Sequence, residues 1–299
     1  MSSAPLLMLL SSLLFAVMGV CVKLASAHYS AGEMVLYRAL VGAVFMAALA
    51  RWRGVSLRTR VPAMHFWRSG IGASSLLLWF FAISGLPLAT AMTLNYMSSV
   101  WMALFLIAGA VMLGAARVDG RLVAAVLAGF AGVALVLRPS MQPDQVWHGL
   151  AGLLSGLLAA LTYLQVTALG RQGEPAERVV FYFSLGGIVI GLVWMLADGA
   201  RPHHLRGALL LLAIGLLATA AQLMMTHAYR IGHTLTNASL QYLGLGFSFA
   251  FGVLLFGDAV TASALGGMVL IVGAGLYATL LRSREQHDSP DTRSPPNDT

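Results

Sequence analysis

The sequence has few charged residues and a single cysteine. Only 10% of its 299 residues are Asp, Glu, Lys or Arg, whereas 59% are hydrophobic and the mean hydropathy is +0.82. The lone Cys21 excludes a disulfide framework and a thiolate metal site. The chain contains no Gly-Lys-Ser/Thr phosphate loop, so we do not expect it to hydrolyse ATP. Because soluble domains carry about 25% charged residues, this composition argues against a water-soluble fold.

Ten apolar stretches fill most of the chain. A hydrocarbon core about 30 Å thick needs roughly 20 apolar residues per helix. The polar segment 282–299 is rich in Pro, Asp and Ser, which is typical of a disordered tail, here expected to be cytoplasmic. The sequence therefore predicts an all-α integral membrane protein with ten transmembrane helices near 5–26, 32–50, 67–86, 89–113, 121–138, 149–170, 178–197, 207–229, 234–256 and 262–281.

Arginine is distributed unevenly among the loops between these spans. With the N-terminus inside, thirteen arginines fall on the cytoplasmic side and only Arg138, Arg201 and Arg206 on the opposite side. Cytoplasmic loops of membrane proteins carry an excess of Lys and Arg. We therefore expect a multi-pass protein of a bacterial inner membrane with both termini in the cytoplasm. The net charge of +7 then reports orientation and gives no reason to expect a nucleic acid partner.

The second half of the chain resembles the first half. A shift of 144 residues places Glu33 on Glu177, and a shift of 146 places Asn95 on Gln241. Each unit contains an odd number of spans, so the two units must lie in the membrane with opposite orientations. Inverted repeats are typical of transporters that work by alternating access around a central site. We therefore predict two inverted five-helix repeats, residues 1–138 and residues 139–281.

Further motifs connect the sequence to a known family. Arg38 lies inside the second span, and two short motifs occur in the fifth span and before the last, Gly129-Phe130-Ala131-Gly132 and Leu255-Phe256-Gly257-Asp258. In these features, over residues 5–281, the chain resembles the drug/metabolite transporter superfamily, specifically its EamA-type ten-helix branch. Members commonly have Glu where Asp258 stands. They also often have Pro midway along the fourth and ninth spans, where Ser99 and Leu245 stand, which leaves open whether these helices break.

Polar residues recur at helical spacing on six of the predicted spans. An unpaired polar group in hydrocarbon is costly, so these faces should point into the bundle or into a wet cavity. Such residues also form hydrogen bonds between membrane helices, so packing is the alternative interpretation. The family resemblance implies a cavity between the third, fourth, eighth and ninth spans, with the first and sixth contributing. The candidate substrate-binding residues are Trp79, Asn95, Ser99, Trp101, Tyr163, Gln222, Asn237, Gln241 and Tyr242.

Three charged residues of the first half lie within or beside spans, and we treat them as candidates for coupling or ion pairing. Lys23 is about one turn from the outer end of its span and can snorkel to the interface. Glu33, at a helix start, either caps that helix or carries a coupling proton. Arg38 lies about 9 Å inside its span at 1.5 Å per residue, so it needs a partner, either Glu33 or a substrate carboxylate.

These features predict a secondary transporter for a small polar, amino-acid-derived metabolite, without a cofactor or a resident metal ion. The sequence does not define the coupling ion, for which the proton is the first candidate, or the oligomeric state. Export is favoured, with an opine-type metallophore as candidate cargo. The alternative within transport is uptake of a nucleoside-like or S-adenosylmethionine-like metabolite. The alternative from another class is a lipid-modifying membrane enzyme, but no recognised motif joins the acidic and histidine residues of the outer loops.

Overall fold

The computed structural model describes residues 4–112, 120–137, 145–231, 240–259 and 261–288, and every regular element within these ranges is a helix. Six of the helices are long and apolar enough to cross a membrane: α1, α2, α3, α7, α8 and α9. The prediction of an all-α membrane protein is therefore confirmed. The bounds are α1 (Ala4–Ala25), α2 (Ala31–Trp52), α3 (Pro62–Gly85), α4 (Leu88–Tyr96), α5 (Ser98–Met112), α6 (Gly120–Leu137), α7 (Val146–Arg171), α8 (Ala176–Asp198), α9 (Leu205–Ile231), α11 (Leu243–Phe256) and α12 (Ala262–Asp288).

Local sequence sets several of the helix ends. Ser30 and Glu33 form a capping box at the start of α2, in which each side chain accepts the other residue's backbone N–H. Pro62 begins α3, a position where its missing N–H costs nothing. Gly257 ends α11 with a φ of 62°, a left-handed conformation that suits glycine. At the other end of the chain, α12 continues to Asp288, so residues 282–288, which composition predicted to be disordered, are helical.

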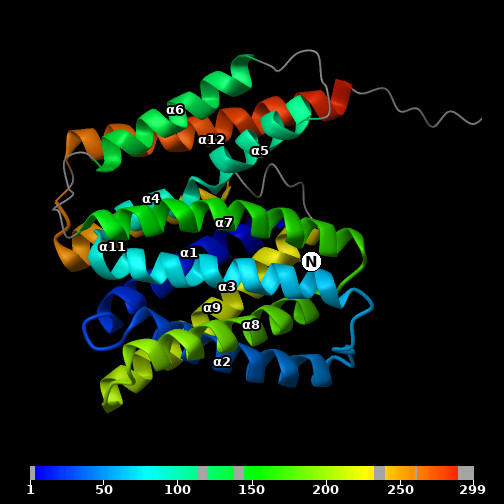
Figure 1. The fold of residues 1–299 in the computed structure, drawn as a ribbon, viewed down its shortest axis with the longest axis vertical. Coiled ribbons are helices and arrows are strands. Elements are labelled where there is room, and N and C mark those ends of the chain that lie inside the picture. The colour runs from blue at the N-terminus through cyan, green and yellow to red at the C-terminus, as the bar shows by residue number, and fades with distance from the viewer. Residues whose placement is uncertain (1–3, 113–119, 138–144, 232–239, 260, 289–299) are drawn as a thin grey trace, which may run out of the picture.

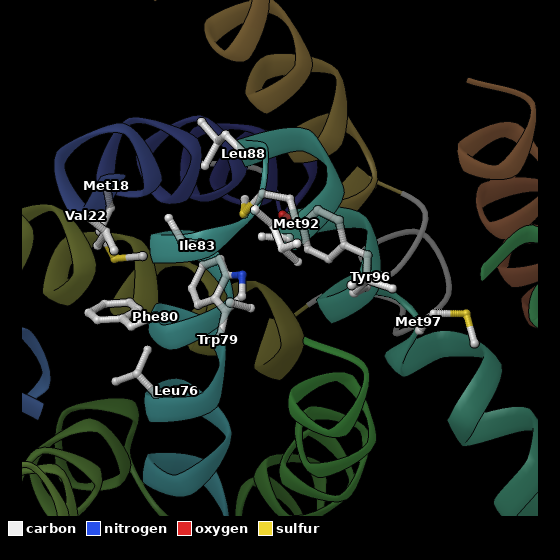
Figure 2. Packing of buried hydrophobic residues seen from close by; sticks show 14 of the residues in the cluster. Met18, Val22, Leu76, Trp79, Phe80, Ile83, Leu88, Met92, Tyr96 and Met97 are labelled. Atoms are coloured by element: carbon white, nitrogen blue, oxygen red, sulfur yellow. The ribbon is translucent and has the colours of Figure 1, made fainter. Parts of the chain in front are cut away.

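The predicted fourth span is two helices and not one continuous helix. α4 ends at Tyr96 and α5 begins at Ser98, and Figure 2 shows Met97 at the junction. The backbone N–H of Met97 donates to both Thr93 O and Leu94 O, which tightens the last turn of α4. α7 packs directly against this turn, since a Cβ placed on Gly156 would lie 2.5 Å from Leu94 O. A helix break here therefore needs no proline.

The predicted ninth span has a related break. Helical residues 240 and 241 are followed by a turn at Tyr242, and α11 begins at Leu243. The segment just before, residues 232–239, lies outside the described residues. Under the shift of 146 found in the sequence, Tyr242 corresponds to Tyr96, which directly precedes the break in the fourth span. Within the described residues, the turns at Met97 and Tyr242 therefore lie within one residue of positions that this shift relates.

Helices of the first half pack mainly against helices of the second half. The most extensive associations join α1 with α9, α2 with α8, α3 with α7, and α6 with α12. Further associations join α3 with α8, α2 with α9, α1 with α11, and α4 with α7. In Figure 1, α5, α6 and α12 form a layer at the top, beside the group that contains the other helices. The two halves of the chain therefore interleave.

The largest buried hydrophobic cluster lies where α1, α3 and α4 meet. Met18 and Val22 of α1, Phe80 of α3, and Leu88 and Met92 of α4 are completely buried there (Figure 2). Since lipid tails are as apolar as these side chains, the contacts stabilise the bundle through dispersion and close packing more than through the hydrophobic effect. This cluster fixes the faces of α3 and α4 that carry the candidate site.

Candidate functional site

A partly open cavity of about 80 Å³ lies between helices from both halves of the chain. It has room for a few water molecules. Its wall combines aromatic rings, hydroxyl groups, three side-chain amides and two guanidinium groups, and no carboxylate is among the described residues that form it. The lining residues are Phe15, Arg38, Arg68, Gly72, Ser75, Leu76, Trp79, Asn95, Tyr96, Ala159, Thr162, Tyr163, Phe183, Gln222, Met225 and Gln241.

The cavity brings together five of the nine candidate substrate-binding residues: Trp79, Asn95, Tyr163, Gln222 and Gln241. Trp79 and Tyr96 are both visible at the edge of the hydrophobic cluster in Figure 2. The indole Nε1 of Trp79 is buried and has no hydrogen-bond partner among the described residues, so this donor is available to a ligand. Whether these side chains bind substrate remains a prediction.

The other four candidates do not line this cavity in the described structure. Trp101 packs edge-on against Phe130 with ring centroids 5.0 Å apart, and Tyr242 lines a separate apolar groove between α11 and α12. Trp101 lies on α5, beyond the break at Met97, so it does not continue the face of α4 that carries Asn95. The side chain of Ser99 and the whole of Asn237 lie outside the described residues.

The repeat-related pair Asn95 and Gln241 lines the cavity, but the two side chains have different partners. Asn95 Nδ2 donates to Ser155 Oγ at 3.1 Å, which ties α4 to α7. Gln241 Nε2 donates to the Tyr163 hydroxyl at 2.8 Å, and its Oε1 accepts from the Tyr229 hydroxyl at 3.2 Å. Gln241 therefore bridges α7 and α9.

The bridge formed by Tyr163, Gln241 and Tyr229 lies between two cavities. Tyr163 and Gln241 line the central cavity, whereas Tyr229 lines a second cavity of about 260 Å³ that also contacts Glu174 and Arg230. The rings of Tyr163 and Tyr229 stack with centroids 6.2 Å apart. We name this set the tyrosine bridge. The second cavity lies at the end of the bundle that the arginine distribution assigns to the cytoplasm.

Arg38 and Arg68 approach the central cavity from α2 and α3 and lie against one aromatic ring. Their guanidinium carbons are 5.1 Å and 4.2 Å from the ring centroid of Phe183 on α8. Both side chains are buried. Gly72 leaves space for Arg68, because a Cβ there would lie 2.6 Å from Arg68 Nη1. Arg38 Nε, Arg68 Nε and Arg68 Nη1 have no hydrogen-bond partner among the described residues.

Arg68 was not among the residues predicted for the site, and it was counted with the thirteen cytoplasmic arginines. The third span was expected to start near residue 67, whereas α3 begins at Pro62 and carries Arg68 in its second turn. The number of cytoplasmic arginines therefore falls from thirteen to twelve, against three on the opposite side, so the asymmetry remains. The spacing of Arg68, Gly72, Ser75 and Trp79 on one helical face could have revealed it.

Glu33 accepts hydrogen bonds from two backbone groups and does not pair with Arg38. Its Oε2 accepts from Ser30 N at 3.0 Å, and its Oε1 accepts from Arg201 N, in the loop after α8, at 2.9 Å. The Glu33–Arg38 ion pair offered as one alternative is therefore absent. Lys23 donates to the carbonyl oxygens of Ile83 and Leu86, which satisfies the C-terminal end of α3.

A second polar cluster joins the α2–α3 loop to the α7–α8 loop. Glu174 accepts hydrogen bonds from Thr59 Oγ1 and Arg178 Nη1 and contacts His65 Nε2, each at 3.0 Å. We name these four residues the Glu174 cluster. Burial raises the pKa of Glu174, but the hydrogen bonds from His65, Arg178 and Thr59 outweigh burial and hold that pKa below its ordinary value. Glu174 is therefore ionised at neutral pH, and its carboxylate holds the two loops together.

Comparisons with known proteins agree with these features. Residues 2–138 match the EamA-like transporter family. The chain is 31% identical to the pseudopaline exporter CntI of Pseudomonas aeruginosa, over 92% of this chain and 95% of that protein. A riboflavin transporter of Rhizobium johnstonii is 30% identical over 74% of this chain and 72% of that protein. A solved crystal structure with 21% identity superposes with a TM-score of 0.65 over 95% of this chain and 100% of its own, which shows a shared fold. The chain belongs to the EamA-like transporter family, within the drug/metabolite transporter superfamily.

Proposed function

We propose that this protein is a secondary transporter that exports an opine-type metallophore across the bacterial inner membrane. The observation that carries the proposal is the similarity to the pseudopaline exporter CntI, which extends over 92% of this chain. The cavity supports it, because its mainly apolar wall carries three side-chain amides and two guanidinium groups, which can replace water around the polar groups of a small solute. The relatives are transporters, which favours transport over an enzymatic activity.

We infer that transport proceeds by alternating access of ten helices in two inverted repeats. The helix associations support this arrangement, since exchanging the halves converts α1 with α9 into α7 with α3, and α1 with α11 into α7 with α5. The breaks at Met97 and Tyr242 fall within one residue of equivalent positions under the shift of 146. Transporters of this kind place their site between such repeats, beside discontinuous helices. The cavity of about 80 Å³ must widen to admit a metabolite with many atoms.

The proton gradient is the proposed energy source, since the chain has no phosphate loop. Glu33 remains the candidate proton carrier of the first half. Protonation of its carboxylate would weaken the hydrogen bonds from Ser30 N and Arg201 N, and would loosen α2 from the loop after α8. Both termini are expected in the cytoplasm, as the arginine asymmetry indicates.

The direct test is uptake of labelled pseudopaline into inverted membrane vesicles, in which export from the cell appears as accumulation. We expect accumulation above that of vesicles without the protein, and a change in its extent when a pH gradient is imposed. Labelled riboflavin serves as the contrasting solute. Leu254→Ala, at an exposed lipid-facing position, serves as the control variant and should accumulate pseudopaline as the parent does. Equal accumulation of pseudopaline with and without the protein would refute the proposed cargo.

A further inference from the structure

Among the described residues, the central cavity is lined by two positively charged side chains, Arg38 and Arg68, and by no negatively charged one. The ion pairs between described residues involve Arg53, His65, Arg178, Glu174 and Glu177, so neither cavity arginine takes part in one. Glu33, the nearest acidic residue along α2, is held by backbone N–H groups. Two like charges are thus kept together inside a membrane bundle.

Such an arrangement is costly unless something else neutralises it. A buried charge without a partner is strongly destabilising, and charged residues inside membrane segments generally mark substrate pathways. The Phe183 ring offers a cation–π contact to both guanidinium groups, but it carries no negative charge that could neutralise them. Three buried guanidinium nitrogens remain without a partner among the described residues.

The guanidinium group is suited to oxyanion ligands, carboxylates and phosphates. Its planar fork of N–H donors matches the two oxygens of a carboxylate, and such bidentate pairs are among the strongest hydrogen-bonded contacts in proteins. The rest of the cavity offers neutral donors and acceptors from Asn95, Gln222 and Gln241, and the free indole N–H of Trp79. A ligand amine can be accommodated by amide oxygens and aromatic faces, but no described lining residue would neutralise it.

We propose that Arg38 and Arg68 form a carboxylate clamp, and that the cargo carries at least two carboxylates and a net negative charge in the cavity. This proposal rests on the proposed function in taking the central cavity as the transport site. An opine joins two acid units through a secondary amine, so it presents two carboxylates on either side of one nitrogen. Phe183 holds the two guanidinium groups side by side, and Gly72 leaves room for Arg68 to turn its fork toward the ligand.

The test uses the purified full-length chain in lipid nanodiscs and three small probes. Iminodiacetate carries two carboxylates on a secondary amine, sarcosine carries one, and inorganic phosphate is an anion of different geometry. Binding is measured from the increase in melting temperature and from the intrinsic tryptophan fluorescence, to which Trp79 contributes, as each probe is titrated. We expect iminodiacetate to bind more tightly than sarcosine and phosphate, because only iminodiacetate can engage both arginines.

Arg38→Gln and Arg68→Gln should each weaken iminodiacetate binding by at least about tenfold. Gly72→Ala keeps both charges but displaces the end of Arg68, so it should weaken binding as well. Arg51→Gln, on the same helix as Arg38 but exposed, is the matched control and should bind as the parent does. In the absence of ligand, Arg68→Gln should melt at the same temperature as the parent or higher, because it removes one of two like charges.

Several results would overturn the clamp. The first is equal binding of iminodiacetate and phosphate by the parent. The second is unchanged iminodiacetate binding in both arginine variants. The third is a lower melting temperature of ligand-free Arg68→Gln together with iminodiacetate binding as tight as that of the parent. The last result would assign the pair a structural role.

The proposed function fails in a different way: if vesicles do not accumulate pseudopaline but the arginine variants lose iminodiacetate binding, the cargo is wrong and the clamp stands. If pseudopaline accumulates equally in the parent and both arginine variants, the clamp is wrong and the transporter stands.

Discussion

Glu33 and Glu177 fasten opposite ends of the same helix pair. Glu33, in the first turn of α2, accepts from Arg201 N just beyond α8, at 2.9 Å. Glu177, in the first turn of α8, accepts from Arg53 Nη1 just beyond α2, at 2.7 Å. The two glutamates are 144 residues apart, the same shift that relates the halves of the sequence. α2 and α8 are therefore antiparallel and joined at both ends, which favours movement as one unit.

Substitution of Glu33 separates its structural role from its proposed coupling role. Glu33→Ala removes the capping box and leaves Arg201 N without its acceptor, so we expect a loss of stability of about 1–2 kcal/mol, measured as a lower melting temperature. Glu33→Gln keeps an acceptor oxygen but cannot change its charge. If Glu33 carries the coupling proton, Glu33→Gln should fold and should lose the response of vesicle accumulation to an imposed pH gradient. Unchanged accumulation in Glu33→Gln would remove this residue from the coupling mechanism.

The tyrosine bridge predicts a specific effect on access to the central cavity. Gln241→Ala removes the hydrogen bonds to Tyr163 and Tyr229, and Tyr229→Phe removes one of them. Ser75 lines the central cavity, so a cysteine at this position, Ser75→Cys in a Cys21→Ser background, reports on access to it. In each of the two bridge variants, this cysteine should react several-fold faster with a small thiol reagent added from the cytoplasmic side. Leu254→Ala is the control. Labelling at the parental rate in both variants would show that the bridge does not restrict access.

The repeat-related amides should matter for transport as well. Asn95→Ala leaves Ser155 without its partner on α4, and a lost buried hydrogen bond costs about 1–3 kcal/mol. We therefore expect Asn95→Ala and Gln241→Ala to transport labelled pseudopaline at a rate lower by several-fold, at membrane expression close to that of the parent. Parental rates in both variants at equal expression would contradict the assignment of a central site to this pair.

Orientation can be tested at two exposed positions. Ser56 lies in the α2–α3 loop and His204 in the α8–α9 loop, and both are exposed. In the Cys21→Ser background, Ser56→Cys should react with an impermeant thiol reagent only after the cells are opened. His204→Cys should react with the same reagent in intact cells. The reverse pattern would overturn the orientation derived from the arginine asymmetry.

The sequence predicts features that depend on local composition, and it fails where distant segments decide the outcome. Apolar length identifies the long spans, and the position of Glu33 at a helix start identifies capping as one of its two expected roles. The break after Tyr96 has no proline to announce it, and it coincides with the close approach of Gly156 from a helix about 60 residues away. Arg68 was misplaced because His65 and Arg68 lower the hydropathy of the first turns of α3. Only the folded bundle shows that this polar turn is buried against α8.

The Glu174 cluster predicts how stability depends on pH. Hydrogen bonds from His65, Arg178 and Thr59 hold the pKa of Glu174 below its ordinary value of about 4.5, so the folded state favours the carboxylate. A lowered pKa contributes stability that is fully present above the ordinary value and is lost as the pH falls through the lowered one. The parent should therefore lose melting temperature as the pH falls below about 4.5, and Glu174→Gln should lose less over this interval.

At neutral pH the same substitution should lower the melting temperature by about 2–5 °C, because the acceptor loses its charge and one of its two oxygens becomes an NH2 donor. Arg171→Gln, at the exposed last residue of α7, serves as the matched variant and should follow the parent at both pH values. Because the cluster joins the α2–α3 loop to the α7–α8 loop, Glu174→Gln should also speed labelling of Ser75→Cys from the cytoplasmic side. If the melting temperature of Glu174→Gln falls as much as that of the parent at acidic pH, another carboxylate governs the loss of stability there.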